Sequence, residues 1–213
     1  MSLRTKDIED ILRNLWVKEK EDKDIMTEDQ IDKDYITELF KKGYINIDHH
    51  KILLSESGEY LGRELVRKHR IAETVVADLF LADRDEMEDL ADQIEHVMSH
   101  DVEDNIMRIL GYPKKCPHGH TIPPRDGMVV DNKDSAVPLL ETEVGDIGTV
   151  SYIKTADAKK LQKIVNLGLL PGSKIQLIQK FPIFVFQLGN TQLAVDKELA
   201  NEIYVVVESN EPV

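Results

Sequence analysis

Four side chains that can bind a metal ion recur at helical spacing near the middle of the chain: Glu88, Asp92, Glu95 and His96. Residues at positions i, i+4, i+7 and i+8 lie near one face of a helix. Three carboxylates gathered there would repel one another, and a divalent cation is the simplest way to neutralise them. The pattern therefore indicates a metal site, whereas a single carboxylate of this set would more often belong to a solvated acidic face.

Further candidate ligands lie on two other predicted helices. His69 and Glu73 have i, i+4 spacing, and antiparallel packing of their helix on the next one would bring them near the first group. Asp10, on the N-terminal predicted helix, would add another carboxylate. Taken alone, His69 is more often an ordinary surface or packed histidine, so the hypothesis depends on the surrounding sequence.

The single cysteine, Cys116, stands in a Cys-x-His-x-His pattern with His118 and His120. A zinc site would need a fourth ligand, which no neighbouring residue clearly supplies, so a turn is the simpler interpretation. His49 and His50 likewise indicate a polar turn between two strands. One cysteine excludes an internal disulfide and is typical of a reducing compartment.

The helices that must position these side chains follow from the spacing of apolar residues. They are predicted over residues 7–20, 28–42, 57–81, 85–100 and 101–110. Two short apolar runs, 44–47 and 51–54, flank a polar turn and predict a β-hairpin. A helix that ends in Lys-Lys-Gly and is followed by a hairpin is typical of a winged-helix unit.

The C-terminal part of the chain has a different pattern. Five of the eight prolines fall within residues 112–138, which predicts a linker or an irregular segment. Five strand-like runs and one helix, 159–167, follow from residue 139 on. Short strands joined by tight turns within about 70 residues predict a small β-barrel.

Composition limits the classes of protein. The 213 residues are 41% hydrophobic and 31% charged, which suits two small folded domains. No apolar run approaches the roughly 20 residues of a membrane-spanning helix, and the first residues lack the apolar core of an export signal. We expect a cytoplasmic protein that does not span a membrane. The net charge of −13 opposes non-specific binding to nucleic acid, because phosphates attract clustered Lys and Arg.

Extended motifs resemble the diphtheria-toxin-repressor family of iron- and manganese-dependent regulators, in the family's order and spacing. They are Lys68-His69-Arg70-Ile71-Ala72-Glu73, Ile94-Glu95-His96-Val97-Met98-Ser99, Val102-Glu103 and Cys116-Pro117-His118-Gly119 with Ile122-Pro123. Residues 139–207 separately resemble the ferrous-iron-transport A-type domain that many of these regulators carry. Its motifs are Asp146-Ile147-Gly148, Leu167-Gly168-Leu169-Leu170-Pro171-Gly172 and Ala200-Asn201-Glu202-Ile203.

The resemblance implies an α+β fold in four parts. These are a shortened winged-helix unit at 1–56, a helical metal-binding and dimerisation domain at 57–123, a linker at 124–138 and an SH3-like β-barrel at 139–213. It also implies a homodimer. The predicted helices around 85–110 carry apolar residues beyond a single apolar stripe. A twofold interface would bury these residues, unless they pack within one chain. These residues are Met98, Val102, Ile106, Met107, Ile109 and Leu110.

The resemblance further implies two metal sites. The primary, activating site would comprise Asp10, Asp92, Glu95 and His96. The ancillary site would comprise His69, Glu73 and Glu88, and Asp157 is the candidate for an oxygen ligand from the C-terminal domain. Because all of these ligand atoms are oxygen or imidazole nitrogen, Fe²⁺ or Mn²⁺ is favoured over soft ions, and Zn²⁺ or Co²⁺ would bind in vitro.

DNA is the expected partner of such a regulator, but the N-terminal unit departs from the family pattern. A helix-turn-helix places a support helix before the recognition helix, whereas residues 24–43 leave room for one helix. Residues 1–56 hold 10 basic and 14 acidic side chains, and carboxylates repel DNA phosphates. The candidate DNA contacts are Lys33, Lys41, Lys42 and Lys51.

Three functional hypotheses follow. The first is a metal-dependent transcriptional repressor of metal homeostasis, whose DNA-binding dimer is favoured by metal. The second is a metal-sensing or interaction protein of the same family that has lost DNA binding. The third is a metalloenzyme, since a bound metal can polarise water. No catalytic triad or phosphate-binding loop motif accompanies the ligands, so we expect a protein that is not an enzyme.

Overall fold

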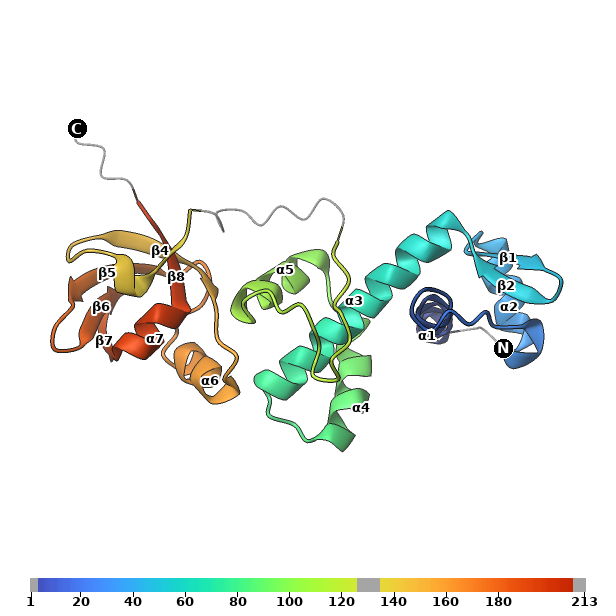
Figure 1. Cartoon of the computed structure of the whole chain (residues 1–213), viewed down its shortest axis with the longest axis horizontal. Coiled ribbons are helices and arrows are strands. Elements are labelled where there is room, and N and C mark those ends of the chain that lie inside the picture. Colours follow the sequence, from blue (N-terminus) through green and yellow to red (C-terminus); the bar gives the residue numbers. More distant parts are fainter. Residues whose placement is uncertain (1–3, 126–134, 209–213) are drawn as a thin grey trace.

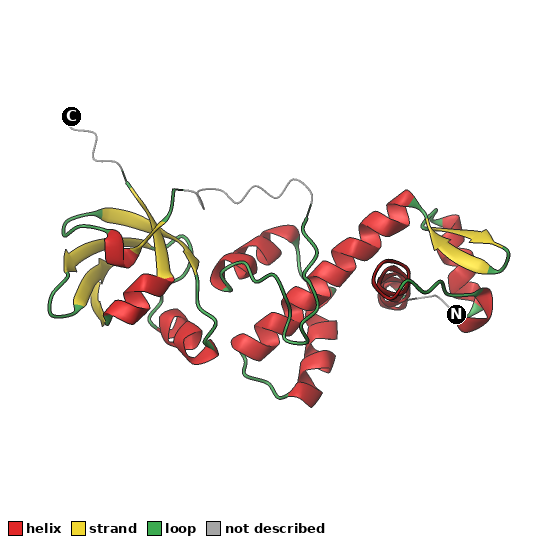
Figure 2. Cartoon of the chain, viewed as in Figure 1, coloured by secondary structure: helices red, strands yellow, loops and turns green. Residues whose placement is uncertain are grey.

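The computed structural model describes residues 4–125 and 135–208, so most of the predicted linker at 124–138 lies outside the described residues. The described chain is elongated, with the N-terminal unit at one end and the C-terminal sheet at the other (Figure 1). Helices and a six-stranded antiparallel sheet make an α+β protein, which confirms the predicted fold class (Figure 2). None of the described helices is long and apolar enough to span a membrane.

The N-terminal unit contains two α-helices and a hairpin. Its elements are α1 (Thr5–Trp16) with a π-helical continuation (Val17–Asp22), a 3-10 turn (Glu28–Gln30), α2 (Lys33–Lys41), β1 (Ile45–Asp48) and β2 (Lys51–Leu54). Leu12 of α1, Leu39 of α2 and Ile45 of β1 are almost fully buried in one core, which fixes the hairpin against both helices. This core orients the face of α1 that carries Asp10 towards the rest of the molecule.

The predicted helix over 28–42 is wrong in its first turn. Ile31 has an extended backbone, and Asp32 caps α2 by accepting a hydrogen bond from the Asp34 amide at 2.9 Å. An N-cap side chain of this kind starts a helix, because it satisfies an amide that has no partner within the helix. Among the described residues, α2 is the one α-helix between α1 and the hairpin.

The helical domain is built on the long helix α3 (Glu56–Asp78), with α4 (Arg84–Glu95) and α5 (His100–Ile109) beside it (Figure 1). The predicted helix over 85–100 is too long, because Ser99 caps α5 by accepting from the Val102 amide. The prediction of an intermolecular role for Met98, Met107 and Leu110 is also wrong in part. All three are buried within this chain, while Val102 is exposed.

The C-terminal sheet has the strand order β3-β8-β4-β5-β6-β7. Its elements are β3 (Val137–Pro138), β4 (Ile147–Ile153), α6 (Ala158–Asn166), β5 (Lys174–Gln179), β6 (Phe184–Leu188), β7 (Thr191–Val195), α7 (Lys197–Glu202) and β8 (Ile203–Val207). Strand β3 and helix α7 are too short for a clear periodic signal, and the sequence did not predict them. Val75 of α3 and Leu110 of α5 join the core of this sheet, so the sheet packs on the helical domain.

Candidate metal centre

Residues of α1 and the end of α4 bring the first predicted group of ligands together. Asp10 lies on α1, Asp92 and Glu95 lie in the last turn of α4, and His96 follows directly after it. One ligand atom from each of these four residues lies within 4.8 Å of the others. The His96 imidazole contacts α1, with Nδ1 2.6 Å from Glu9 Oε2 and Nε2 3.5 Å from Asp10 Oδ1. The group therefore joins two elements that are distant in sequence.

The second predicted group lies next to the first, between α3 and α4. The His69 Nε2 atom is 3.2 Å from Glu73 Oε1 and 3.6 Å from Glu88 Oε2. The other ring nitrogen of His69, Nδ1, is 2.5 Å from Glu95 Oε2. The His69 imidazole thus links the two groups, and all seven predicted ligands form one continuous array.

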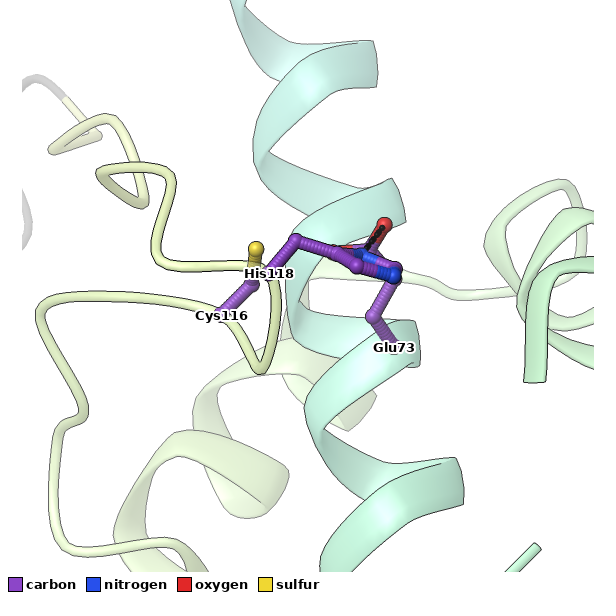
Figure 3. A group of neighbouring side chains, drawn as sticks. All are labelled: Glu73, Cys116 and His118. Carbon is purple, nitrogen blue, oxygen red and sulfur yellow. Dashed lines mark hydrogen bonds and ion pairs between the residues drawn. The ribbon is translucent and has the colours of Figure 1, made fainter. Parts of the chain in front are cut away.

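A loop after α5 adds two side chains to this array. One ligand atom each from Glu73, Cys116 and His118 lie within 4.8 Å of one another (Figure 3). The His118 Nδ1 atom is 3.1 Å from Glu73 Oε1, and Nε2 is 3.6 Å from Glu88 Oε1. The Cys-x-His-x-His pattern thus contributes its first two members, and His120 is not in the group. Sequence reasoning missed this combination, because its third member lies on α3.

Burial suits this array to a cation. Glu95 is 1% exposed and Glu73 is 4% exposed. Three buried polar atoms, Asp10 Oδ1, His96 Nε2 and Glu73 Oε2, have no hydrogen-bond partner in the described part of the chain. A buried polar atom normally has a partner, and a divalent cation held among these atoms would supply one. The donor set of carboxylate oxygen and imidazole nitrogen fits Fe²⁺ or Mn²⁺.

Two cationic side chains of α1 lie against the carboxylates. The Lys6 Nζ atom is 2.5 Å from Asp92 Oδ2. The Arg13 Nη1 atom is 2.6 Å from each carboxylate oxygen of Glu95 and 2.7 Å from His69 Nδ1. These contacts offset part of the negative charge of the array.

The charges shift the pKa values of the ancillary group. Burial would lower the pKa of His69, but its hydrogen bonds to Glu73 and Glu95 outweigh burial and raise that pKa to about 9. Burial would raise the pKa of Glu73, but hydrogen bonds from His69 and Cys116 lower it to about 2. The raised pKa favours the His69 imidazolium at neutral pH, in which Nδ1 donates to Glu95, so Arg13 and His69 both donate to this carboxylate. A metal must displace the His69 proton in order to bind there.

The other ligands differ in their proton affinity. Burial raises the pKa of Asp10. Burial would raise the pKa of Asp92, but the hydrogen bond from Lys6 and the charges of Lys6, Arg13 and His96 together lower that pKa below its usual value. Burial raises the pKa of the Cys116 thiol, and the hydrogen bond to Glu73 adds to this effect. Cys116 would therefore bind a metal only after losing its proton.

The remaining predicted site residues lie elsewhere. Asp157 is the N-cap of α6, where its Oδ1 accepts from the Lys159 amide at 2.9 Å, and it belongs to none of the ligand groups among the described residues. The Lys42 Nζ atom lies 3.5 Å from Glu38 Oε1, so this carboxylate offsets the charge of Lys42. The other three candidate DNA contacts, Lys33, Lys41 and Lys51, are exposed on the N-terminal unit.

A further group of acidic residues and a histidine has a structural explanation. Ligand atoms of Glu64, His100 and Glu103 lie within 4.8 Å of one another. Two arginines already offset this charge, since Arg67 Nε lies 2.5 Å from Glu103 Oε1 and Arg125 Nη1 lies 3.6 Å from the same atom. We assign this group to the stability of the helical domain.

Comparison with known proteins agrees with the geometry. The model of the iron dependent repressor metal binding and dimerisation domain matches residues 55–124, and that of the FeoA domain matches residues 137–207. A manganese-dependent transcriptional repressor in complex with manganese has a similar structure, with a TM-score of 0.51 and 25% identity. That likeness covers 94% of this chain and 100% of the other.

Two curated relatives show the relationship in sequence. The diphtheria toxin repressor of Corynebacterium diphtheriae is 28% identical over 137 residues, and the match spans only 60% of this chain and 60% of that repressor. The iron-dependent repressor IdeR of Mycobacterium tuberculosis is 33% identical over 185 residues, which cover 80% of each chain. The chain therefore belongs to the iron-dependent repressor family that includes IdeR and the diphtheria toxin repressor.

Proposed function

We propose that this chain is a metal-dependent transcriptional regulator, in which Fe²⁺ or Mn²⁺ bound to the primary ligands favours a DNA-binding homodimer. The primary ligands are Asp10, Asp92, Glu95 and His96. The observation that carries the proposal is their position, since Asp10 comes from the N-terminal unit and the others come from the helical domain. A metal ion held by both parts would tie them together and select one arrangement from several.

The relatives support the choice of metal. IdeR is named as iron-dependent, and the structurally similar repressor is named as manganese-dependent and contains manganese. The ligands of this chain are hard oxygen and imidazole nitrogen donors, which these two ions accept. Zn²⁺ or Co²⁺ would serve as substitutes in vitro. We propose no enzymatic activity, in keeping with relatives that are repressors.

We propose a second, ancillary ion next to the first. Its ligands would be His69, Glu73 and Glu88, with Cys116 and His118 as further candidates. Glu73 supports the proposal of an ancillary ion. Its carboxylate belongs both to the group with His69 and Glu88 and to the group with Cys116 and His118. The shared carboxylate would make the loop after α5 part of the metal response.

We propose that the dimer forms through the helical domain, which the matching family model describes as a dimerisation domain. Leu90 of α4, Val97 after α4 and Val102 of α5 are exposed apolar side chains, and Val97 is 80% exposed. A twofold contact would remove such side chains from water. Light scattering after size exclusion tests this, and Val97→Asp should shift the protein towards a monomer.

Binding to DNA tests the main proposal. The purified protein is titrated onto labelled DNA from upstream of its own gene, and fluorescence anisotropy is recorded with Mn²⁺, with Fe²⁺ under argon and with chelator. Two salt concentrations separate sequence-selective contacts from phosphate attraction. We expect selective binding that requires metal. Equal binding with and without metal would contradict the proposal.

One observation favours a second candidate function, a metal sensor that acts through a protein partner. Phe40 of α2 is 55% exposed, and with Ile36 and Ile47 it borders a cavity of about 380 Å³. Apolar side chains do not contribute to phosphate contacts, whereas an exposed apolar patch suits a protein surface. Measured metal uptake without DNA binding in any condition would favour this second function.

A further inference from the structure

The guanidinium of Arg13 lies inside the array of candidate ligands. Its Nη1 atom is 2.6 Å from both carboxylate oxygens of Glu95 and 2.7 Å from His69 Nδ1. Its Nη2 atom is 3.5 Å from Asp92 Oδ1 and 3.7 Å from Asp10 Oδ1. One side chain of α1 therefore touches members of both the primary and the ancillary group.

This position conflicts with metal binding through Glu95. A carboxylate binds a cation through the same lone pairs that here accept hydrogen bonds from Arg13. A metal ion bound to Glu95 would also lie close to the guanidinium and repel it, and this repulsion is strong where water is largely excluded. Glu95 is 1% exposed, so solvent screens the two charges little. The metal ion must therefore replace the guanidinium.

Arg13 has room to leave, unlike the buried Arg67. Arg67 is 3% exposed, and its guanidinium is also held by the Pro123 carbonyl oxygen at 2.6 Å. The Arg13 side chain is 16% exposed and borders a cavity of about 570 Å³, which is also lined by Asn14 and by the ancillary candidates His69, Glu73 and Glu88. The guanidinium can turn away from Glu95 towards the solvent side of this cavity while α1 stays in place.

We propose that Arg13 is a tethered counter-cation that stabilises the array without metal, and that a divalent ion must displace it from Glu95. Arg13 then sets the metal concentration at which the array fills. It also couples the two groups of ligands, because its departure frees Glu95 and the neighbouring His69 together. This inference rests on the proposed binding of metal by the array.

The variant Arg13→Gln tests the inference in the full chain. Mn²⁺ is titrated in competition with a fluorescent chelator, which gives the dissociation constant for the wild type and the variant. We expect Arg13→Gln to bind Mn²⁺ about tenfold more tightly, the equivalent of one charge-assisted hydrogen bond that no longer competes. Lys6→Gln should produce a smaller increase, because Lys6 contacts Asp92 and does not contact Glu95.

Thermal unfolding adds a readout that a purely structural arginine would not produce. In chelator, Arg13→Gln should lower the unfolding midpoint, because the buried Glu95 loses its partner. In saturating Mn²⁺ the midpoint should equal or exceed that of the wild type. The control is Arg4→Gln, which removes an exposed cation of the same helix region that pairs with Asp7. We expect this control to leave both measurements unchanged.

Unchanged or weaker Mn²⁺ binding by a folded Arg13→Gln protein would overturn the inference. If that variant does not fold in chelator, Arg13→Lys replaces it. A single ammonium cannot reproduce the fork of a guanidinium, so tighter binding is again expected and unchanged binding overturns the inference. A wild type that takes up no Mn²⁺, or an Asp92→Ala variant that binds as well as the wild type, would instead refute the proposed function.

Discussion

The His118 Nδ1 atom lies 3.1 Å from Glu73 Oε1, so a turn after α5 delivers an imidazole to a carboxylate that is 45 residues earlier in the chain. Gly119 makes this turn possible, because its φ of +85° lies in the left-handed region that other residues rarely adopt. Glu73 therefore belongs to two groups of candidate ligands at once.

Removal of this shared carboxylate should reduce metal binding more than removal of its loop partner. We expect Glu73→Gln to abolish binding of the ancillary ion and His118→Gln to weaken it by roughly tenfold, since His118 can be replaced by water. Equilibrium dialysis with Co²⁺ measures the number of ions bound. Equal losses in the two variants would contradict the shared role of Glu73.

Asp92 should link metal to DNA binding. Asp92→Ala removes a ligand of the primary group, and we expect the metal-dependent increase in anisotropy with operator DNA to disappear. Asp89→Asn, on an exposed position of the same helix α4, is the matched control and should retain the increase. A full metal response in Asp92→Ala would exclude this residue from the activating site.

The stability of the metal-free protein, measured in chelator, should depend on pH through the pair of His69 and Glu73. The pKa of His69 is raised from 6.5 to about 9, so its contribution is fully present below pH 6.5 and is lost as the pH rises through 9. The pKa of Glu73 is lowered from 4.5 to about 2, so its contribution is present above pH 4.5 and is lost as the pH falls through 2. This pair therefore stabilises most between pH 4.5 and 6.5.

Urea unfolding in chelator, from pH 4.5 to above pH 9, provides the measurement. We expect His69→Gln to flatten the decrease in the free energy of unfolding between neutral pH and pH 9, because glutamine does not titrate. An equally steep alkaline decrease in His69→Gln would assign the effect to another group.

The buried ion pair of Arg67 and Glu103 should support the helical domain without affecting metal binding. Arg67 is 3% exposed and Glu103 is 0% exposed. Glu103→Gln removes the charge of the carboxylate from this buried pair, which costs about 3–5 kcal/mol in the free energy of unfolding. Urea unfolding measures the loss, and Mn²⁺ affinity in native buffer should be unchanged. Weaker Mn²⁺ binding by the folded variant would show that this group contributes to the metal centre.

The sequence by itself determined the local part of the centre. Asp92, Glu95 and His96 lie within five residues at the end of one helix, so helical geometry alone brings their side chains to one side. The pairing of His69 with Glu73 follows from the same rule. The family motifs then indicated that Asp10 belongs with them, because that position matches a ligand position of related regulators.

Only the tertiary structure decided which side chains join this set from elsewhere. Cys116 and His118 reach Glu73 because the loop after α5 folds back on α3, and Arg13 reaches Glu95 because α1 and α4 both pack against α3. Spacing along the chain cannot show such contacts, since they depend on how the helices pack and on which basic side chain that packing places beside a carboxylate. Two helix boundaries had a local cause instead: Asp32 caps the start of α2 and Ser99 caps the start of α5, where an apolar pattern alone would continue the helix.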